Sequence, residues 1–196
     1  MEKKKFFSAK NVTTLGVLLA LVIVLQAFGG TISFGAVTLN FTLIPIVLGA
    51  IVLGPGAGAI LGLACGVVVL IQVIIAPAGF YALIWLNDPV VTVLTCIIKT
   101  TAAGLVSGWL FSLLKKKNQT IAVFVASGIV PVINTALFIV GCLFMTSLHQ
   151  SADGNVLRYI LVGLVTFNFF FEFGINLLLA PAIHTVYNVV EKRIRK

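Results

Sequence analysis

The chain has 196 residues, of which 60% are hydrophobic and only 9% are charged, and its mean hydropathy is +1.19. Soluble domains carry roughly 25% charged residues, so this composition excludes a water-soluble fold and predicts an integral membrane protein. Most of the basic residues that give the net charge of +8 lie at the ends of the apolar segments, and this placement argues against a nucleic-acid surface.

Six apolar segments predict an all-α integral membrane protein, a six-transmembrane-helix bundle that forms a single domain over residues 1–196. A helix needs about 20 apolar residues to cross the hydrocarbon core. The second segment is shorter and leads into a glycine- and proline-rich turn, GPGAGA. The last two segments are longer than a crossing of the hydrocarbon core requires, so their ends should tilt or project from it. The six segments are 12–29, 42–54, 57–76, 89–113, 120–147 and 157–189.

Most of the 13 basic residues lie in three clusters: at the N-terminus, directly after the fourth segment, and at the C-terminus. With six crossings, all three clusters fall on the same side of the membrane. The positive-inside rule then predicts that both termini are cytoplasmic. The basic start and the apolar run ending near QAFGG also resemble a signal peptide, but an A-x-A cleavage site is missing, which favours an uncleaved helix.

Small residues recur at helical spacing in three segments. Gly58, Gly62 and Gly66 form a ridge on the third segment, Gly104 and Gly108 repeat the pattern on the fourth, and Gly16 and Ala20 repeat it on the first. Such ridges let helix backbones approach closely. We expect most of them to pack the bundle itself, whereas the ridge on the first segment could instead be a docking surface for another membrane protein.

The outer connections 30–41, 77–88 and 148–156 are longer than the inner ones. The first alternates apolar and polar residues, TISFGAVTLNF, which is typical of an extended flap or a hairpin. The second contains Tyr81, Trp85, Asn87 and Asp88 near the expected membrane surface. Aromatic residues there are usually interface anchors, and they are also suited to stacking against a small ligand.

Polar residues occur inside the predicted membrane segments. Lys99 lies ten residues into the fourth segment, counted from Pro89, or roughly 15 Å deep. Asn134 and Thr135 follow a helix-bending Pro131 in the fifth.

In the sixth segment, Asn168, Glu172 and Asn176 share one helix face because they are four residues apart. Counted from residue 157, Glu172 is expected at a depth of roughly 22 Å and Asn168 at about 16 Å. A lone ion at mid-bilayer is unfavourable by about 3 kcal/mol. These groups should therefore face the bundle interior, with Lys99 near Glu172.

Two interpretations of this cluster remain open. It is either a structural salt bridge with asparagine cross-links, or the floor of a ligand cavity that opens outward. Ionisable groups inside a membrane are functional by default. Lys99, Asn134 and Asn168 are better placed than the deeper Glu172 for a solute that enters from outside.

Other chemistry is not expected. Cys65, Cys96 and Cys142 lie in three different segments, without the spacing of metal ligands or a redox pair. His149 and His184 lie near opposite ends of their segments, with no nucleophile nearby in sequence. The turn GPGAG lacks the Lys-Ser/Thr of a phosphate-binding loop. We therefore predict no enzyme activity, no cofactor and no metal site.

Four stretches resemble one known family: LGVLLALVIVLQ, LIPIVLGAIVLGPGAGAILGLACGVVVL, PVINTALFIVGC and FNFFFEFGINLLLAP. They are similar to the substrate-binding S-components of energy-coupling factor (ECF) vitamin transporters of the prokaryotic cell membrane. The resemblance implies that the protein captures a vitamin from outside, in the outer halves of its helices beneath the first outer loop. It also implies assembly with a transmembrane coupling subunit and two ATPase subunits, and toppling in the membrane to release the ligand.

The resemblance also implies roles for particular residues. The family docks through an A-x-x-x-A-x-x-x-A ridge on its first helix, matched here by Gly16, Ala20 and Val24, of which the third is β-branched rather than small. In the first outer loop, Phe34 and Asn40 correspond to possible lid contacts.

The expected ligand-binding set is Lys99, Asn134, Asn168, Glu172, Asn87, Trp85, Phe34 and Asn40. Pantothenate is slightly preferred over riboflavin, folate or another vitamin, because Lys99 suits its carboxylate. That preference disappears if Glu172 already neutralises Lys99.

Two other functions remain as alternatives. A self-sufficient, proton-coupled secondary transporter would use Glu172 as a proton relay, although no inverted halves are detectable in the sequence. A purely structural membrane subunit would bind no small molecule at all.

Overall fold

The computed structural model describes residues 8–29, 33–34, 37–38, 41–76, 80–151, 155, 158, 160–161 and 165–194. Within these residues, five helices are long and apolar enough to cross a membrane. The long helices are α1 (Ala9–Gly29), α3 (Pro55–Ile75), α5 (Pro89–Leu114), α6 (Gln119–Leu143) and α9 (Thr166–Ile194). The short elements are β1 (Ser33–Phe34), β2 (Val37–Thr38), α2 (Leu43–Val52), α4 (Phe80–Asn87) and α7 (Thr146–Ser151).

The second predicted crossing is a half-length helix. α2 has 10 residues and therefore rises about 15 Å, half of the hydrocarbon core. It ends where Gly54 adopts a φ of 102° and Pro55 begins α3, because a proline is favoured in a first helical turn. Most of its side chains are buried, since it lies between the long helices and contacts α1, α3, α5, α6 and α9.

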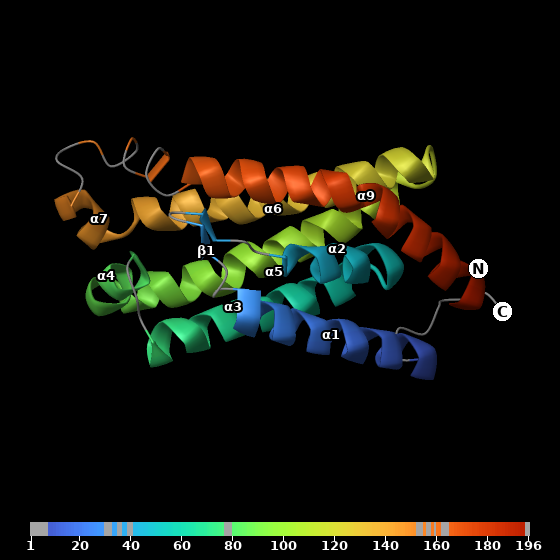
Figure 1. Cartoon of the computed structure of the whole chain (residues 1–196), viewed down its shortest axis with the longest axis horizontal. Coiled ribbons are helices and arrows are strands. Elements are labelled where there is room, and N and C mark those ends of the chain that lie inside the picture. The colour runs from blue at the N-terminus through green and yellow to red at the C-terminus, as the bar shows by residue number, and fades with distance from the viewer. Residues whose placement is uncertain are drawn as a thin grey trace.

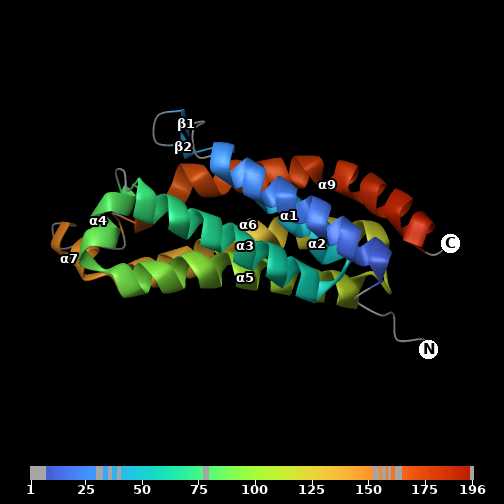
Figure 2. The same cartoon turned by 90° about the horizontal axis from the view of Figure 1, so that it is seen from below.

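The long helices form an elongated bundle in which α3 packs on α5, α5 on α6, and α6 on α9 (Figure 1). The start of α1, the turn between α5 and α6, and the end of α9 lie at one end of the bundle, on the right in Figure 1. We call this the basic end, after Lys10 at the start of α1 and Lys115, Lys116 and Lys117 in the turn. α4 and α7 lie at the opposite end, as the second view also shows (Figure 2). That the basic end faces the cytoplasm stays a prediction.

The two predicted glycine ridges pack within the bundle, as expected, and the structure shows that they pack against each other. A Cβ atom on Gly62 would collide with the carbonyl group of Thr100, and one on Gly58 with the backbone of Gly104. One turn further on, a Cβ on Gly66 would come within 2.5 Å of the carbonyl oxygen of Cys96. The backbones of α3 and α5 are therefore in direct contact, which sets the position of Lys99 relative to α3.

The first outer connection contains a hairpin, which was one of the two predicted forms. β1 and β2 pair antiparallel, with Ser33 opposite Thr38 and Phe34 opposite Val37. β2 contacts α9, and the hairpin lies beside the beginning of that helix (Figure 2).

Two predicted features need correction at the end opposite the basic end. α6 ends at Leu143, before a turn into α7, rather than at residue 147. The connection 77–88 is largely helical, because α4 occupies Phe80–Asn87. α9 begins at Thr166, and Ile160, Leu161 and Val165 before it are π-helical.

Candidate functional site

Lys99 lies where four helices converge. It follows Pro89, the first residue of α5, by ten residues, and it is half-buried. Its Nζ atom lies 4.9 Å from the ring centroid of Phe138 on α6, a cation–π contact. Tyr81 on α4, Cys96 on α5 and Glu172 on α9 act on it electrostatically. The structure therefore brings Lys99 and Glu172 into one cluster, as the sequence suggested.

Glu172 is buried, with 9% of its surface exposed. It follows Thr166, the first residue of α9, by six residues. Because Ile160, Leu161 and Val165 before α9 are already π-helical, the sequence-based depth of roughly 22 Å stays a prediction.

Asn134 and Asn176 present unpartnered oxygens to the interior. Asn134 is 7% exposed and Asn176 is 1% exposed. Within the described part of the chain, the Oδ1 atom of each lacks a hydrogen-bond partner, while Asn176 donates its Nδ2 to the backbone oxygen of Glu172 at 2.9 Å. A buried unsatisfied acceptor is unfavourable by about 1–3 kcal/mol. A water molecule or a ligand that donates a hydrogen bond would remove this penalty.

An amide network on α1 and α3 adjoins the Lys99 cluster. Gln26 donates its Nε2 to Gln72 Oε1 at 3.1 Å, and Gln72 returns a bond to the Gln26 backbone oxygen at 3.1 Å. Thr42, just before α2, donates to Gln26 Oε1 at 3.0 Å, and Cys65 Sγ lies 3.6 Å from the same oxygen. Cys65 also lies within electrostatic range of Lys99, so the two groups are neighbours.

Sequence reasoning missed Gln26, Gln72 and the site role of Tyr81. The glutamines carry no charge and lie in segments whose apolar character dominates the pattern. The sequence did contain a signal, because an amide side chain within an apolar helix needs a hydrogen-bond partner. The first and the third apolar segments each carry one such glutamine. Tyr81 was noted as an aromatic residue near the membrane surface and suited to stacking against a small ligand, but it was left out of the expected ligand-binding set, because α4 was not predicted.

The other predicted residues of the second connection lie elsewhere. Trp85 is half-buried and packs against the apolar core. Asn87 is exposed, and its Nδ2 donates to the carbonyl oxygen of Leu83 at 2.8 Å within its own helix. The structure therefore does not bring Asn87 into the Lys99 cluster.

Asp88 fastens the start of α5 to α7. Its carboxylate accepts hydrogen bonds from the backbone N–H and hydroxyl groups of both Thr146 and Ser147, at 2.6–3.1 Å. Burial raises the pKa of this carboxyl, but the four hydrogen bonds outweigh burial and hold the pKa at about 2. These hydrogen bonds hold the start of α5, the helix that carries Lys99, against α7.

The remaining predicted residues have mixed outcomes. Asn168 is half-buried, one turn before Glu172. Asn40 lies outside the described residues, and of Phe34 only its place in β1 is described.

The predicted docking ridge faces outward. Gly16, Ala20 and Val24 are all exposed, Val24 by 50%. A Cβ added to Gly16 would meet no atom within 4 Å. This face of α1 is therefore open to lipid or to another membrane protein.

Five long apolar helices around a polar interior define the class: a multi-pass membrane protein with inward-facing polar groups. The chain belongs to the family of ECF transporter substrate-specific components, because the model of that family matches residues 10–184, from the start of α1 into α9. This match confirms the resemblance noted in the sequence. Members are transporter subunits rather than enzymes, and they act on a small-molecule substrate together with other subunits. A search of the curated proteins found no match.

Proposed function

We propose that the protein binds a vitamin within the half of the bundle opposite the basic end, as the high-affinity subunit of an ATP-driven importer. The observation that carries this proposal is the position of Lys99. It is a half-buried cation where α4, α5, α6 and α9 converge. A cation held in a membrane interior is a functional-site hypothesis by default.

The proposed site has a cation, an anion and neutral polar groups within one space. Lys99 binds a carboxylate, and Glu172 accepts hydrogen bonds from hydroxyl groups. Asn134 offers its unpartnered oxygen to a ligand donor. Gln26 and Gln72 form the wall on the side of α1 and α3. Asn168 lines the same helix face as Glu172.

Pantothenate stays the proposed ligand, slightly ahead of riboflavin, folate or another vitamin. It carries one carboxylate at one end and hydroxyl groups at the other, so it would satisfy Lys99 and Glu172 together. Riboflavin has hydroxyl groups but no carboxylate for Lys99.

Transport requires partners, which we propose to be a transmembrane coupling subunit and two ATPase subunits. The exposed ridge of Gly16, Ala20 and Val24 on α1 is the proposed contact with the coupling subunit. The basic end is proposed to face the cytoplasm of a prokaryotic cell, by the positive-inside rule.

The direct test is mass spectrometry of small molecules released when the detergent-purified protein is denatured. We expect one vitamin at a stoichiometric amount. A protein that is purified empty, and that binds no member of a vitamin panel, would contradict the proposal and favour a structural role for the Lys99–Glu172 cluster.

A further inference from the structure

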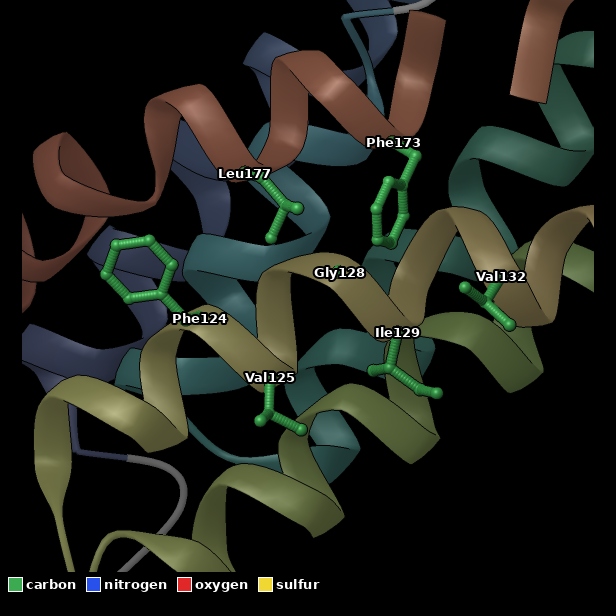
Figure 3. A pocket seen from close by; sticks show the side chains of 7 residues that line it. All are labelled: Phe124, Val125, Gly128, Ile129, Val132, Phe173 and Leu177. Atoms are coloured by element: carbon green, nitrogen blue, oxygen red, sulfur yellow. The ribbon is translucent and has the colours of Figure 1, made fainter. Parts of the chain in front are cut away.

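An apolar groove runs along the outer surface between α6 and α9 (Figure 3). Its volume is about 390 Å³, and it is open along one side. Phe173 and Leu177 point from α9 toward Gly128 on α6 (Figure 3). The groove is lined by Phe124, Val125, Gly128, Ile129, Val132, Phe173 and Leu177.

Gly128 forms the floor of this groove because it has no side chain. A Cβ atom there would come within 3.3 Å of both Leu177 Cδ2 and Phe173 Cε2. On the open side, Phe124 and Val125 are each 37% exposed. A long, thin apolar group therefore fits the groove better than a bulky side chain does.

The same two helices become polar toward the basic end. Gln119, the first residue of α6, donates its Nε2 to Asn188 Oδ1 on α9 at 2.5 Å, and the same nitrogen lies 3.3 Å from His184 Nε2. Directly before α6, Lys116 and Lys117 are exposed. From the groove toward the basic end, the surface of α6 and α9 thus changes from apolar to amide-bearing, and it becomes cationic in the turn before α6.

The spacing of these surfaces matches the layers of one membrane leaflet. From Phe124 to Val132 the groove extends eight residues, about 12 Å along α6, and the hydrocarbon of one leaflet is about 15 Å thick. Gln119, the first residue of α6, lies about 8 Å before Phe124 on the same scale, and Lys117 precedes it in the turn, toward the level of the polar headgroups.

We propose that the groove binds an acyl chain of an anionic phospholipid whose phosphate headgroup is held by Lys116 and Lys117. The two exposed ammonium groups select a negative headgroup, and basic residues near a membrane surface attract anionic lipid. The site lies on the outer surface of α6 and α9, and none of its lining residues belongs to the proposed vitamin site.

The test is native mass spectrometry of the full-length protein titrated in detergent with palmitoyl-oleoyl phosphatidylglycerol or the matching phosphatidylcholine. We expect one phosphatidylglycerol to bind at least tenfold more tightly than phosphatidylcholine. Val125→Phe fills the groove from its open side and should abolish this preferred binding. Lys116→Gln with Lys117→Gln should weaken phosphatidylglycerol binding by about 25-fold, at about fivefold per lysine.

Two matched variants control for general effects. Gly174→Leu adds side-chain volume on α9, at an exposed position where a Cβ atom would meet nothing within 4 Å. Arg158→Gln removes an exposed cation far in sequence from the turn. Both should bind phosphatidylglycerol as the wild type does.

Equal binding of the two lipids would overturn the proposal, and so would unchanged phosphatidylglycerol binding by Val125→Phe. A wild-type protein that appears instead as a dimer, and becomes monomeric on Val125→Phe, would assign the groove to a second copy of the chain and overturn the lipid proposal. Gly128→Leu fills the floor of the groove and gives a second, independent test of its role.

Discussion

The role of Lys99 can be tested by replacing it with methionine, which keeps an unbranched apolar stem and removes the ammonium group. If this ammonium binds the vitamin's carboxylate, Lys99→Met should weaken binding at least tenfold, or by about 1.4 kcal/mol. That size is at the lower edge of the range of about 1.5–3 kcal/mol for a hydrogen bond to a charged group.

The same substitution also has a structural consequence that must be separated from binding. Glu172 is 9% exposed and its charge acts on Lys99. Lys99→Met therefore removes a favourable positive charge from the surroundings of a buried carboxylate, which should lower the free energy of unfolding. The double variant Lys99→Met/Glu172→Gln removes both charges and should recover most of this loss.

The assay combines thermal unfolding in detergent with isothermal titration of the vitamin that co-purifies, or of pantothenate. Lys115→Met is the matched control, because Lys115 also lies over an aromatic ring, with its Nζ 5.6 Å from the ring centroid of Phe111, but at the basic end. It should leave vitamin affinity unchanged.

The double variant distinguishes the two interpretations of the cluster. If Lys99 contacts the vitamin, the double variant regains stability but still binds at least tenfold more weakly. A double variant that is stable and binds with wild-type affinity would refute the reasoning and leave the pair as scaffolding. Wild-type affinity in a folded Lys99→Met protein would do the same.

Three further predictions concern the carboxylate of Asp88, the helix interface and the docking face. Asp88 has a pKa lowered from 3.8 to about 2, so it stabilises the fold above pH 4, and this stability is lost as the pH falls from about 4 to about 2. The full shift corresponds to about 2.4 kcal/mol, and screening at this partly exposed carboxylate reduces it to about 1 kcal/mol. Asp88→Asn should lower the melting temperature at pH 7 and flatten its fall in acid, and a wild-type acid profile would contradict this. Gly62→Leu should lower the free energy of unfolding by at least about 1–3 kcal/mol, because its Cβ meets the Thr100 carbonyl, whereas Gly16→Leu should leave it unchanged in the same thermal unfolding experiment. Ala20→Leu should block co-purification with the coupling subunit without changing vitamin affinity, and undiminished transport by this variant would exclude α1 as the docking helix.

Much of the fold follows from local patterns in the sequence. Hydropathy alone identifies the long apolar helices, since each must satisfy its backbone hydrogen bonds internally within the membrane. The contact between α3 and α5 is also predictable, because only glycine at four-residue spacing permits such a close approach, as Gly58, Gly62 and Gly66 show. The family resemblance is likewise visible in short stretches of the sequence.

The proposed site could be predicted only in part. Lys99 and Glu172 were identifiable because a charge in an apolar segment must face a partner. Gln26 and Gln72 were not, since their bonds join residues 46 positions apart and neither residue interrupts the apolar pattern. Tyr81 depended on α4, a short helix within what the sequence suggested was an irregular connection.

The sequence by itself determined that this is a membrane protein with a small number of buried polar groups, because composition and periodicity are properties of single segments. Only the tertiary structure decided that α2 is a ten-residue helix enclosed by the long helices, and that Gln26 on α1 meets Gln72 on α3. These outcomes depend on which helices lie against one another. A ten-residue helix is stable there because its neighbours bury it, and the two amides find each other only because α1 packs against α3.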